Sequence, residues 1–351
     1  MKKLTAVLLA AVLTVTLLSG CGGEKGPVLK VFNWGEYIDM SVLEDFTAET
    51  GIKVIYETYE TNESMYTKVV NSGSNNSYDI VVPSEYMISK MIREGRLAKI
   101  TKENVPNADL MLDQFKGEPF NSFDPNNDYF VPYTWGTVGI VYDVTKVKEP
   151  VTSWNILWDE KYKGEIFMKD DQRDSIGIAL KSLGYSVNST DDKELEEAKQ
   201  KLIDQRDLVL AYVTDEARDK MINGEAAIAV MYSGDASYVM SKNENLRYAL
   251  PEEGANVWMD GLCILESSQN KGLAEQFINF ISRKDIAQKN IDYIEYNSPQ
   301  SEVVADYPPE KLGSIIYNPP ADYLAEKCEV YTDLGDYTQV YSKIWTEVTA
   351  N

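Results

Sequence analysis

The stretch VLKVFNWGEYIDMSVLEDFTAETGIKVIYETYE, residues 28–60, decides the fold class. It begins with the short apolar segment VLKVFNW, which predicts a β-strand over 28–34. The following segment, SVLEDFTAETG, places Leu43 and Phe46 at helical spacing and ends in Gly51, a residue that often terminates helices. IKVIYETYE, residues 52–60, then returns to a strand pattern. A strand, a helix and a strand in close succession form the basic unit of an α/β sheet.

The same alternation continues beyond this unit. NESMYTKVV predicts a helix with Asn62 as its N-cap, and DIVVPS, residues 79–84, predicts a strand. EYMISKMIREG predicts a further helix, because Ile88, Met91 and Ile92 form one apolar stripe. This rhythm indicates an open sheet with helices on its faces.

A second series of elements follows the long, strand-rich segment YFVPYTWGTVGIVYD, residues 129–143. The series contains predicted strands at AAIAVMYS and NVWMDGLCIL, and predicted helices at DKELEEAKQKLIDQ, EARDKMING, LAEQFINFISR and YTQVYSKIWTEV. It also contains the segments SIGIALKSLG and LVLAYV. No long Pro/Gly-rich linker separates the two series, so we expect the chain to cross between two lobes more than once. Such crossings would form a hinge and leave a cleft between the lobes.

The N-terminus predicts export and membrane anchoring. Residues 1–20 read as a lipoprotein signal peptide, because two lysines precede an apolar stretch shorter than the ~20 residues of a membrane-spanning helix. LSGC resembles a bacterial lipobox, which implies cleavage before Cys21 and lipidation of its sulfur. Residues 21–27 then form a tether, and the mature chain is anchored to the membrane without crossing it. An ordinary secretory signal with an incidental cysteine is the alternative.

The composition excludes several classes of function. The chain has 34 basic and 56 acidic side chains and a formal net charge of −22, which argues against nucleic-acid binding and is compatible with cationic ligands. It has no histidine, so His-based triads and His-ligated metal sites are excluded. Besides Cys21, only Cys263 and Cys328 remain, too few for a disulfide scaffold. We expect no metal and no cofactor.

Aromatic and acidic residues occur together at several predicted strand ends, where open α/β sheets bind ligands. Aromatic rings cover methylene groups and attract ammonium groups, by roughly 0.5–2 kcal/mol each, and carboxylates fix cations through charge-assisted hydrogen bonds. Trp258 and Asp260 are two residues apart on one predicted strand and therefore share a face. The pattern predicts a two-lobed protein that binds a cationic ligand. The stretches that show the pattern are NWGEY (33–37), PSEY (83–86), PYTWG (132–136), DDQRD (170–174), MYSGD (231–235), VWMDG (257–261) and IEYNSP (294–299).

Two other functions are compatible with parts of this pattern. A secreted carbohydrate hydrolase would need two carboxylates that flank the scissile bond, but Asp171 and Asp174 lie too close together in one short segment to do so. A receptor of the same architecture for another small cationic solute remains an open alternative.

Several motifs carry a family resemblance: FNWGEYI, ETGIKVIYETYETNESMY, YDIVVPS, FDPNNDYFVPYTWGTVGI, TSWNILWDEKYKG, LGYSVNSTD and VWMDGL, in that order. Over almost all of residues 28–300 the chain resembles the bacterial spermidine/putrescine-binding proteins, the extracytoplasmic receptors of polyamine ABC transporters. The resemblance implies an α/β, two-lobed fold of the periplasmic-binding-protein type (type II), each lobe an open sheet flanked by helices. It also implies a monomeric, non-enzymatic receptor that binds a polyamine in the cleft between its lobes and delivers it to ABC transporter permease subunits.

The resemblance also implies a set of ligand-binding residues. Asp171 and Asp174 would hold one terminal ammonium group, Trp258 would lie along the methylenes, and Asp260 would lie near the middle of the ligand. The full set is Trp34, Glu36, Tyr37, Ser84, Tyr86, Asp171, Asp174, Thr214, Tyr232, Trp258, Asp260 and Tyr296.

Four positions depart from the family pattern. Gly35 replaces a threonine, Asp174 replaces a glutamate, Tyr232 stands where a tryptophan is usual, and Tyr331 falls about where a glutamine is expected. These changes leave the length of the ligand open. The lobe boundaries are predicted at residues 28–135 plus 259–304 for the first lobe and 136–258 plus 305–351 for the second.

Overall fold

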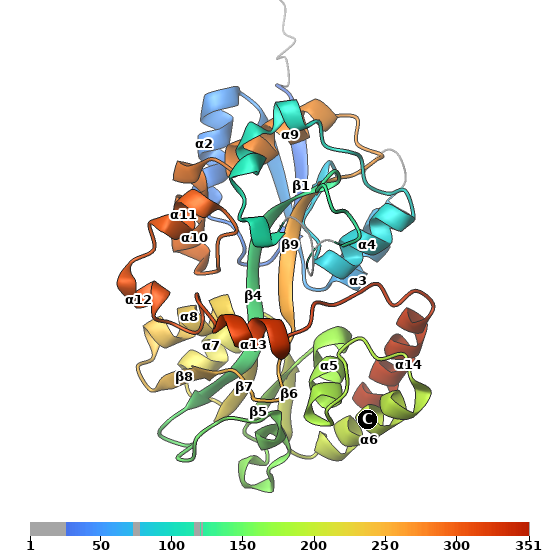
Figure 1. The fold of residues 1–351 in the computed structure, drawn as a ribbon, viewed down its shortest axis with the longest axis vertical. Helices are drawn as coiled ribbons and strands as arrows, with labels where there is room; N and C mark the ends of the chain where they lie inside the picture. The colour runs from blue at the N-terminus through green and yellow to red at the C-terminus, as the bar shows by residue number, and fades with distance from the viewer. Residues whose placement is uncertain (1–25, 73–77, 116–119, 121, 351) are drawn as a thin grey trace, which may run out of the picture.

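The protein folds into two lobes stacked along its long axis (Figure 1). The computed structural model describes residues 26–72, 78–115, 120 and 122–350. The predicted signal peptide, Cys21 and most of the predicted tether lie outside these residues. Strands β4, Phe130–Asp143, and β9, Val257–Ile264, run side by side between the lobes. The prediction of two α/β lobes is therefore confirmed.

The sheet of the first lobe contains strands in the order β2-β1-β3-β9-β4. Strand β1 pairs in parallel with β2 and β3, whereas β9 pairs antiparallel with β3 and with β4. The core residues Leu29 and Val31 alternate along β1, as expected for a strand with a buried face. The three remaining strands are β1, Val28–Trp34, β2, Lys53–Tyr59, and β3, Ile80–Val81.

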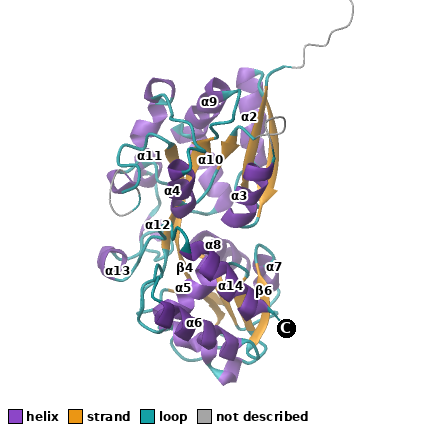
Figure 2. Ribbon diagram, turned by 90° about the vertical axis from the view of Figure 1, so that its right-hand side faces the viewer, coloured by secondary structure: helices purple, strands orange, loops and turns teal. Residues whose placement is uncertain are grey.

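Helices cover both faces of this sheet (Figure 2). Helix α2 begins after Asp39, whose side chain accepts a hydrogen bond from the Ser41 amide, and ends at Gly51 with φ +73°. The predicted N-cap of α3, Asn62, is wrong: Thr61 caps this helix, and Asn62 instead lies buried in its first turn. The helices are α2 (Met40–Thr50), α3 (Asn62–Asn71), α4 (Glu85–Arg93), α9 (Lys271–Ile281), α10 (Lys284–Ile294) and α11 (Ser301–Ala305).

The sheet of the second lobe includes the C-terminal part of β4. Residues 138–143 of β4 pair antiparallel with β7 and, in part, with β8, and the order continues β4-β7-β5-β6. Strand β5 is parallel to both of its neighbours, so the carboxyl ends of β5, β6 and β7 meet at one edge. The strands are β5 (Ile166–Lys169), β6 (Val209–Val213), β7 (Ile228–Tyr232) and β8 (Leu246–Ala249).

The helices of the second lobe include the end of the chain. Helix α14 packs against α5 and α6, and Figure 1 shows the return segment with α13 in front of the middle of the molecule. The helices are α5 (Gln172–Ser182), α6 (Asp192–Gln205), α7 (Ala217–Ile222), α8 (Ser233–Lys242), α12 (Pro309–Leu312), α13 (Ala321–Glu326) and α14 (Tyr337–Thr349). Short 3-10 turns lie at Lys102–Asn104, Pro106–Leu110, Asp113–Phe115, Trp154–Trp158 and Glu160–Tyr162.

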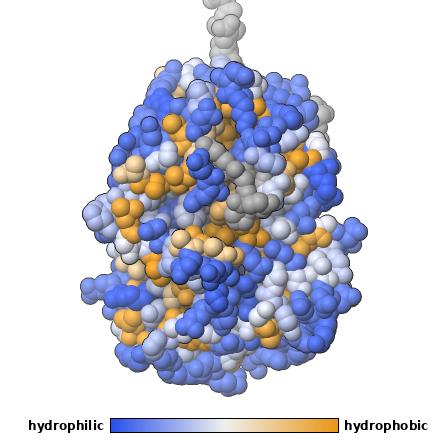
Figure 3. All heavy atoms as spheres, in the orientation of Figure 1, coloured by the Kyte–Doolittle hydropathy of each residue, from blue (hydrophilic) through white to orange (hydrophobic). Residues whose placement is uncertain are grey.

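The face of the protein seen in Figure 3 is mostly hydrophilic, with scattered hydrophobic patches. In the described part of the chain, no helix combines the length and the apolar character that crossing a bilayer requires.

The aromatic and acidic stretches do not all end strands. NWGEY, PSEY, DDQRD and MYSGD follow β1, β3, β5 and β7 as predicted. PYTWG lies inside β4, VWMDG forms the first five residues of β9, and IEYNSP begins at the last residue of helix α10, so the strand-end interpretation was wrong for these three. Elements β5, α8, β8, α10, α11, α12 and α13 were not predicted.

Candidate binding site

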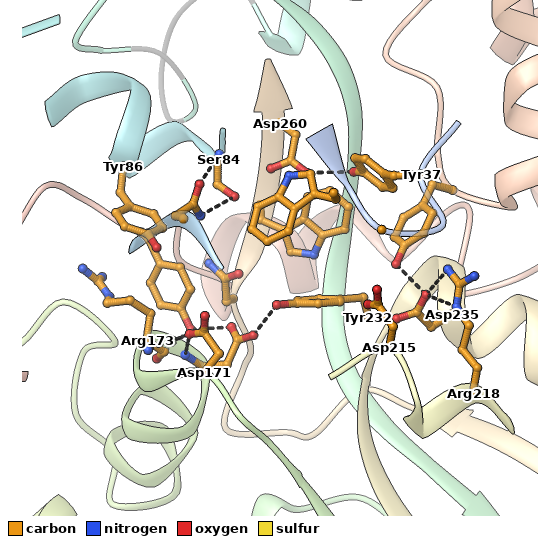
Figure 4. A pocket seen from close by; sticks show the side chains of 18 residues that line it. Tyr37, Ser84, Tyr86, Asp171, Arg173, Asp215, Arg218, Tyr232, Asp235 and Asp260 are labelled. Atoms are coloured by element: carbon orange, nitrogen blue, oxygen red, sulfur yellow. Dashed lines mark hydrogen bonds and ion pairs between the residues drawn. The ribbon is translucent and has the colours of Figure 1, made fainter. Parts of the chain in front are cut away.

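A cavity lies between the two lobes and has about 640 Å³ of free space, part of it open to solvent (Figure 4). Elements from both lobes contribute to it, including the segments that follow β1, β3, β5 and β7. The lining residues are Trp34, Gly35, Tyr37, Asn62, Ser84, Tyr86, Asp171, Arg173, Asp174, Asp215, Arg218, Tyr232, Asp235, Asn256, Trp258, Asp260, Tyr296 and Tyr331.

Four aromatic side chains form a continuous wall of the cavity. The Trp258 ring lies 5.7 Å from the Tyr232 ring and 5.5 Å from the Tyr296 ring, and Tyr296 lies 5.1 Å from Tyr37. All three pairs are edge-to-face, the arrangement that aromatic quadrupoles favour. The wall therefore offers ring faces that cover apolar groups and attract cations.

Asp260 is a buried carboxylate in this wall. Its side chain lies on the same face of β9 as Trp258, and Asp260 is only 4% exposed. The Tyr37 hydroxyl donates a hydrogen bond to Asp260 Oδ2 over 2.8 Å, and Tyr37 also contacts the Thr134 hydroxyl. Burial raises the pKa of Asp260 to about 7, against the lowering effect of the hydrogen bond from Tyr37. A cation placed beside Asp260 would restore its ionised form.

One end of the cavity is built on the N-terminus of helix α5. Asp171 is the N-cap, and its Oδ1 accepts hydrogen bonds from the amides of Arg173 and Asp174. Asp174 accepts hydrogen bonds from the Tyr232 hydroxyl over 2.6 Å and from the Tyr331 hydroxyl over 3.0 Å. Burial raises the pKa of Asp174 to about 6, and the neighbouring charge of Asp171 adds to this effect. DDQRD is therefore a buried helix start and not a solvated turn.

The other end of the cavity contains an ion pair. Arg218 Nε donates to Asp235 Oδ1 over 2.8 Å, and the Tyr296 hydroxyl donates to the same oxygen over 2.8 Å. Asp215 comes from the second lobe and approaches Gly35 of the first lobe. A Cβ atom at Gly35 would lie 2.3 Å from Asp215 Oδ2, so glycine at this position permits the approach.

Three buried polar atoms of β9 and the residue before it have no hydrogen-bond partner among the described residues: Asn256 Oδ1, Trp258 Nε1 and Asp260 Oδ1. Alternate residues of a strand share a face, and all three side chains line the cavity. Buried polar atoms in proteins are nearly always paired, so these atoms indicate hydrogen bonds to a ligand or to water.

Ten of the twelve predicted residues line the cavity, and Glu36 and Thr214 do not. Glu36 is exposed in the turn after β1, where its φ of +48° carries its side chain away from the strand direction. The Thr214 hydroxyl donates to Glu216 Oε2, and the adjacent Asp215 lines the cavity instead. The ligand-binding roles of all twelve stay predictions.

Several lining residues were missed by the sequence analysis. Asp235 belongs to the MYSGD stretch, and Asn256 lies two residues before Trp258 on the same face, so both carried a signal. Arg173 belongs to the DDQRD stretch, whereas Arg218 carried no signal, and neither was chosen because cations are not expected in a site for a cation. Both are paired: Arg218 with Asp235, and Arg173 with Asn188 Oδ1 and the Thr332 carbonyl. Asn62 and Asp215 complete the missed side chains, and Tyr331, which the family resemblance places near an expected glutamine, also lines the cavity.

We expect the substitution Gly234→Ala to disturb the aromatic wall. A Cβ atom at Gly234 would lie 2.3 Å from the Tyr296 ring, so alanine must displace that ring and lower the free energy of unfolding by about 1–3 kcal/mol. Denaturant unfolding measures this loss. Gly272→Ala is the matched control, since a Cβ there meets no atom within 4 Å. Equal stability of the two variants would contradict the prediction.

The chemistry of the cavity defines a class of protein. Five aspartates and two arginines line it, a formal charge of −3 when every acid is ionised, beside a wall of aromatic rings. Within the described ranges no cluster of acidic or cysteine side chains could hold a metal ion. A two-lobed fold with such a cavity between its lobes is typical of receptors that enclose a small solute, here an organic cation with an apolar stem.

Comparisons with known proteins agree with this class. Residues 41–313 match the family described as bacterial extracellular solute-binding protein. The chain is 36% identical to the spermidine/putrescine-binding periplasmic protein of Escherichia coli, over 100% of this chain and 99% of the relative. It is 31% identical to the putrescine-binding periplasmic protein SpuD of Pseudomonas aeruginosa, over 99% of each chain.

Solved structures share the fold. The substrate-binding protein PotD of a spermidine/putrescine ABC transporter from Streptococcus pneumoniae is 38% identical, with a TM-score of 0.77 over 92% of this chain and 98% of that one. The lipoprotein TpPotD of Treponema pallidum is 26% identical, with a TM-score of 0.81 over 92% and 99%. The chain therefore belongs to the bacterial extracellular solute-binding proteins, and the resemblance seen in its sequence is confirmed.

Proposed function

We propose that this protein is an extracytoplasmic receptor that binds a polyamine, spermidine or putrescine, between its lobes and delivers it to an ABC-type importer. The observation that carries the proposal is the pairing of five carboxylates with an aromatic wall in one cavity. Polyamines are chains of methylene groups that carry protonated amines, so they need both features. The names of the relatives support the same ligand class.

The proposed contacts follow from the geometry of the cavity. Trp258 and Tyr296 cover the methylene groups, and Asp260 pairs with an amine in the middle of the wall. Asp171 receives a terminal ammonium group at the α5 end, and Asp235 and Asp215 attract the opposite end of the ligand. The unpartnered Asp260 Oδ1 accepts one of the amine hydrogens.

The remaining assignments are part of the same proposal. The protein acts as a binding protein and not as an enzyme, works as a monomer, and passes its ligand to permease subunits. Cleavage before Cys21 and lipidation of its sulfur anchor it outside the cytoplasm, as the lipoprotein relative from Treponema pallidum supports. Residues 28–135 plus 259–304 and residues 136–258 plus 305–351 form the two lobes that close on the ligand.

A second candidate ligand is a basic amino acid or a similar solute with both a cation and an anionic group. Arg173 and Arg218 in the lining, and the unpartnered Trp258 Nε1 donor, favour an acceptor on the ligand. Both arginines already have partners within the protein, so the polyamine is the stronger candidate.

Isothermal titration calorimetry tests the proposal. We expect saturable binding of putrescine, spermidine or both, and no binding of 1,4-butanediol, which keeps the methylene chain of putrescine but carries no charge. Arginine and lysine test the second candidate. Absence of heat with putrescine, spermidine and spermine would refute the polyamine assignment, and binding of butanediol would refute its electrostatic basis.

A further inference from the structure

Two chain segments run side by side where the lobes meet. One is the start of β9, and the other is the return segment, residues 327–336, which connects α13 to α14 (Figure 1). The Glu329 amide donates to the Ala255 carbonyl, and the Val257 amide donates to the Glu329 carbonyl. The two segments are therefore paired in parallel as far as these residues.

Glu85 connects the two segments where this pairing ends. Two residues further along each segment, the Met259 amide donates to Glu85 Oε2 over 3.0 Å and the Tyr331 amide donates to Glu85 Oε1 over 3.2 Å. Glu85 is the first residue of α4 and is completely buried, yet it does not line the ligand cavity. Its carboxyl group thus takes the place of the main-chain acceptors that continued pairing would offer.

The two amides belong to different lobes. Met259 lies on β9 in the sheet of the first lobe, and the Gly261 amide of the same strand donates to the Pro83 carbonyl just before α4. The return segment is attached to the second lobe, where Lys181 of α5 forms a 2.7 Å ion pair with Glu329. A rotation of one lobe against the other would therefore move α4 relative to the return segment and leave α4 in place relative to β9.

We infer that Glu85 is a positioning residue for ligand binding, which favours the closed arrangement of the lobes without contacting the ligand. This inference rests on the proposed polyamine-binding function. The hydrogen bond from the Tyr331 amide joins the lobes and forms only when they are closed, whereas the bond from the Met259 amide is present in both arrangements. A contact that favours the closed arrangement raises the affinity, because apparent affinity scales with the population of the binding-competent arrangement.

The position of Met259 adds a second role for the same carboxyl group. Met259 lies between Trp258 and Asp260, which both line the cavity. By holding the Met259 amide, Glu85 fixes the main chain that bears these two side chains. One buried side chain thus connects the cavity wall on β9 with the return segment.

The far end of α4 also contacts the return segment. Arg93, the last residue of this helix, forms an ion pair with Asp333 over 2.8 Å, and its side chain is 56% exposed. Exposed ion pairs contribute little, because water and salt screen them. The buried contact at Glu85 is therefore the stronger connection between α4 and the return segment.

The substitution Glu85→Gln tests this connection, because it keeps the size of the side chain. Both oxygens of a carboxyl group can accept hydrogen bonds, whether the group is ionised or protonated, whereas glutamine offers one accepting oxygen and one donating amino group. With the lobes open, the oxygen can serve the Met259 amide. With the lobes closed, one of the two amides faces a donor in either orientation of the glutamine, so the substitution disfavours the closed arrangement.

Calorimetry with putrescine, spermidine and spermine measures the effect. Glu85→Gln should weaken the binding of each polyamine that the wild type binds by the same factor, roughly tenfold or more, since an unpaired buried donor costs about this much. Stopped-flow measurements should show faster dissociation of the ligand. Arg93→Ala, which removes the exposed contact, should change the affinities by less than about threefold.

Glu275→Gln is the matched control. Glu275 lies on α9 in the first lobe, is also buried and is outside the cavity, and it accepts hydrogen bonds from the Thr101 amide and the Asn104 side chain. This variant should lose stability in thermal unfolding without ligand and keep its affinities. Glu85→Gln should show the reverse, a smaller loss of stability and a larger loss of affinity.

The outcomes separate the two proposals. If the wild type binds no polyamine, the proposed function fails and the inference fails with it. If the wild type binds polyamines and Glu85→Gln binds them equally tightly, Glu85 is only structural and the inference alone is wrong. It is also wrong if the loss differs by more than about tenfold between ligands, as expected for a residue that contacts the ligand. Should Glu85→Gln fail to fold, Glu85→Asp, whose shorter side chain cannot reach both amides, must show the uniform loss for the inference to stand.

Discussion

Ligand binding should release protons and tighten by up to about 1,000-fold between pH 5 and pH 8, about 100-fold from Asp260 and about 10-fold from Asp174. Burial raises the pKa of Asp260 to about 7 and the pKa of Asp174 to about 6, with Asp171 adding to the latter. Polyamine amines are protonated throughout this range, so the ligand pairs with the ionised acids. Below its raised pKa each acid holds a proton that the ligand must displace, and affinity falls as the pH falls.

Titrations at a series of pH values, each in two buffers with different heats of ionisation, measure both the affinity and the number of protons released. Affinity that is flat across this range, or proton uptake on binding, would contradict the assignment of these acids to the ligand.

The same acids determine the pH dependence of the protein without ligand. Asp260 and Asp174 bind their protons more tightly in the folded chain, as do Glu85, whose pKa burial raises to about 8, and Glu63, whose pKa burial and Asp171 raise to about 7. Acids with raised pKa values stabilise the fold when they are protonated, so this contribution declines as the pH rises from about 4 to about 8. Ligand affinity has the opposite pH dependence, because the ligand pairs with Asp260 and Asp174 in their ionised forms.

The substitution Asp260→Asn should abolish most of the binding while making the empty protein more stable. Loss of one partner of a buried charge pair typically costs 2–5 kcal/mol of binding free energy, roughly a 30-fold to several-thousand-fold loss of affinity. Asparagine keeps the oxygen that accepts the Tyr37 hydrogen bond but carries no charge into the buried site. At pH 8, where the buried carboxylate would be mostly ionised, we expect the free energy of unfolding to rise by about 1–3 kcal/mol.

Calorimetry measures the expected loss of affinity, and thermal unfolding of the same preparation measures the expected gain in stability. Asp79→Asn is the matched control, because Asp79 is also buried but lies outside the cavity, where it accepts hydrogen bonds from the Lys30 amide and the Ser268 hydroxyl. That variant should lose stability and keep its affinity. If Asp260→Asn destabilised the protein as Asp79→Asn does and still bound polyamines, Asp260 would be a structural residue and not a ligand-binding one.

Local patterns in the sequence predict most of the fold. The alternation from β1 to α4 is visible because each strand is apolar and each helix has a striped face. Strand β5 escaped detection because IFMK is too short for a periodic signal, and α8 because SGDASYVMSK combines glycine and serine with few apolar residues. Pairing with β6 and β7, and burial of its four residues, stabilise β5 instead.

The site was predictable where its residues follow strands or alternate along one. Trp258 and Asp260 share a face by the period of a strand, and Asp171 follows β5 directly. Tyr331 could not be placed from local patterns, because it reaches the cavity through a long return segment and is held there by Glu85, far away in the sequence. Glu36 does not line the cavity and lies in a turn where its φ is +48°, and composition does not reveal that left-handed conformation.

The pairing of β4 in both lobes has a mechanical consequence. Its residues 130–137 belong to a ladder with β9, with a register shift between Pro132 and Thr134, and its residues 138–143 belong to ladders with β7 and β8. The lobes are therefore joined by hydrogen-bonded strands and not by loops alone. Any rotation of one lobe against the other must be absorbed as a change in strand twist, which costs energy in proportion to the stiffness of these strands. Substitutions in β4 or β9 that change the stiffness of these strands would therefore change how readily the lobes close on the ligand and release it, without contacting the ligand itself.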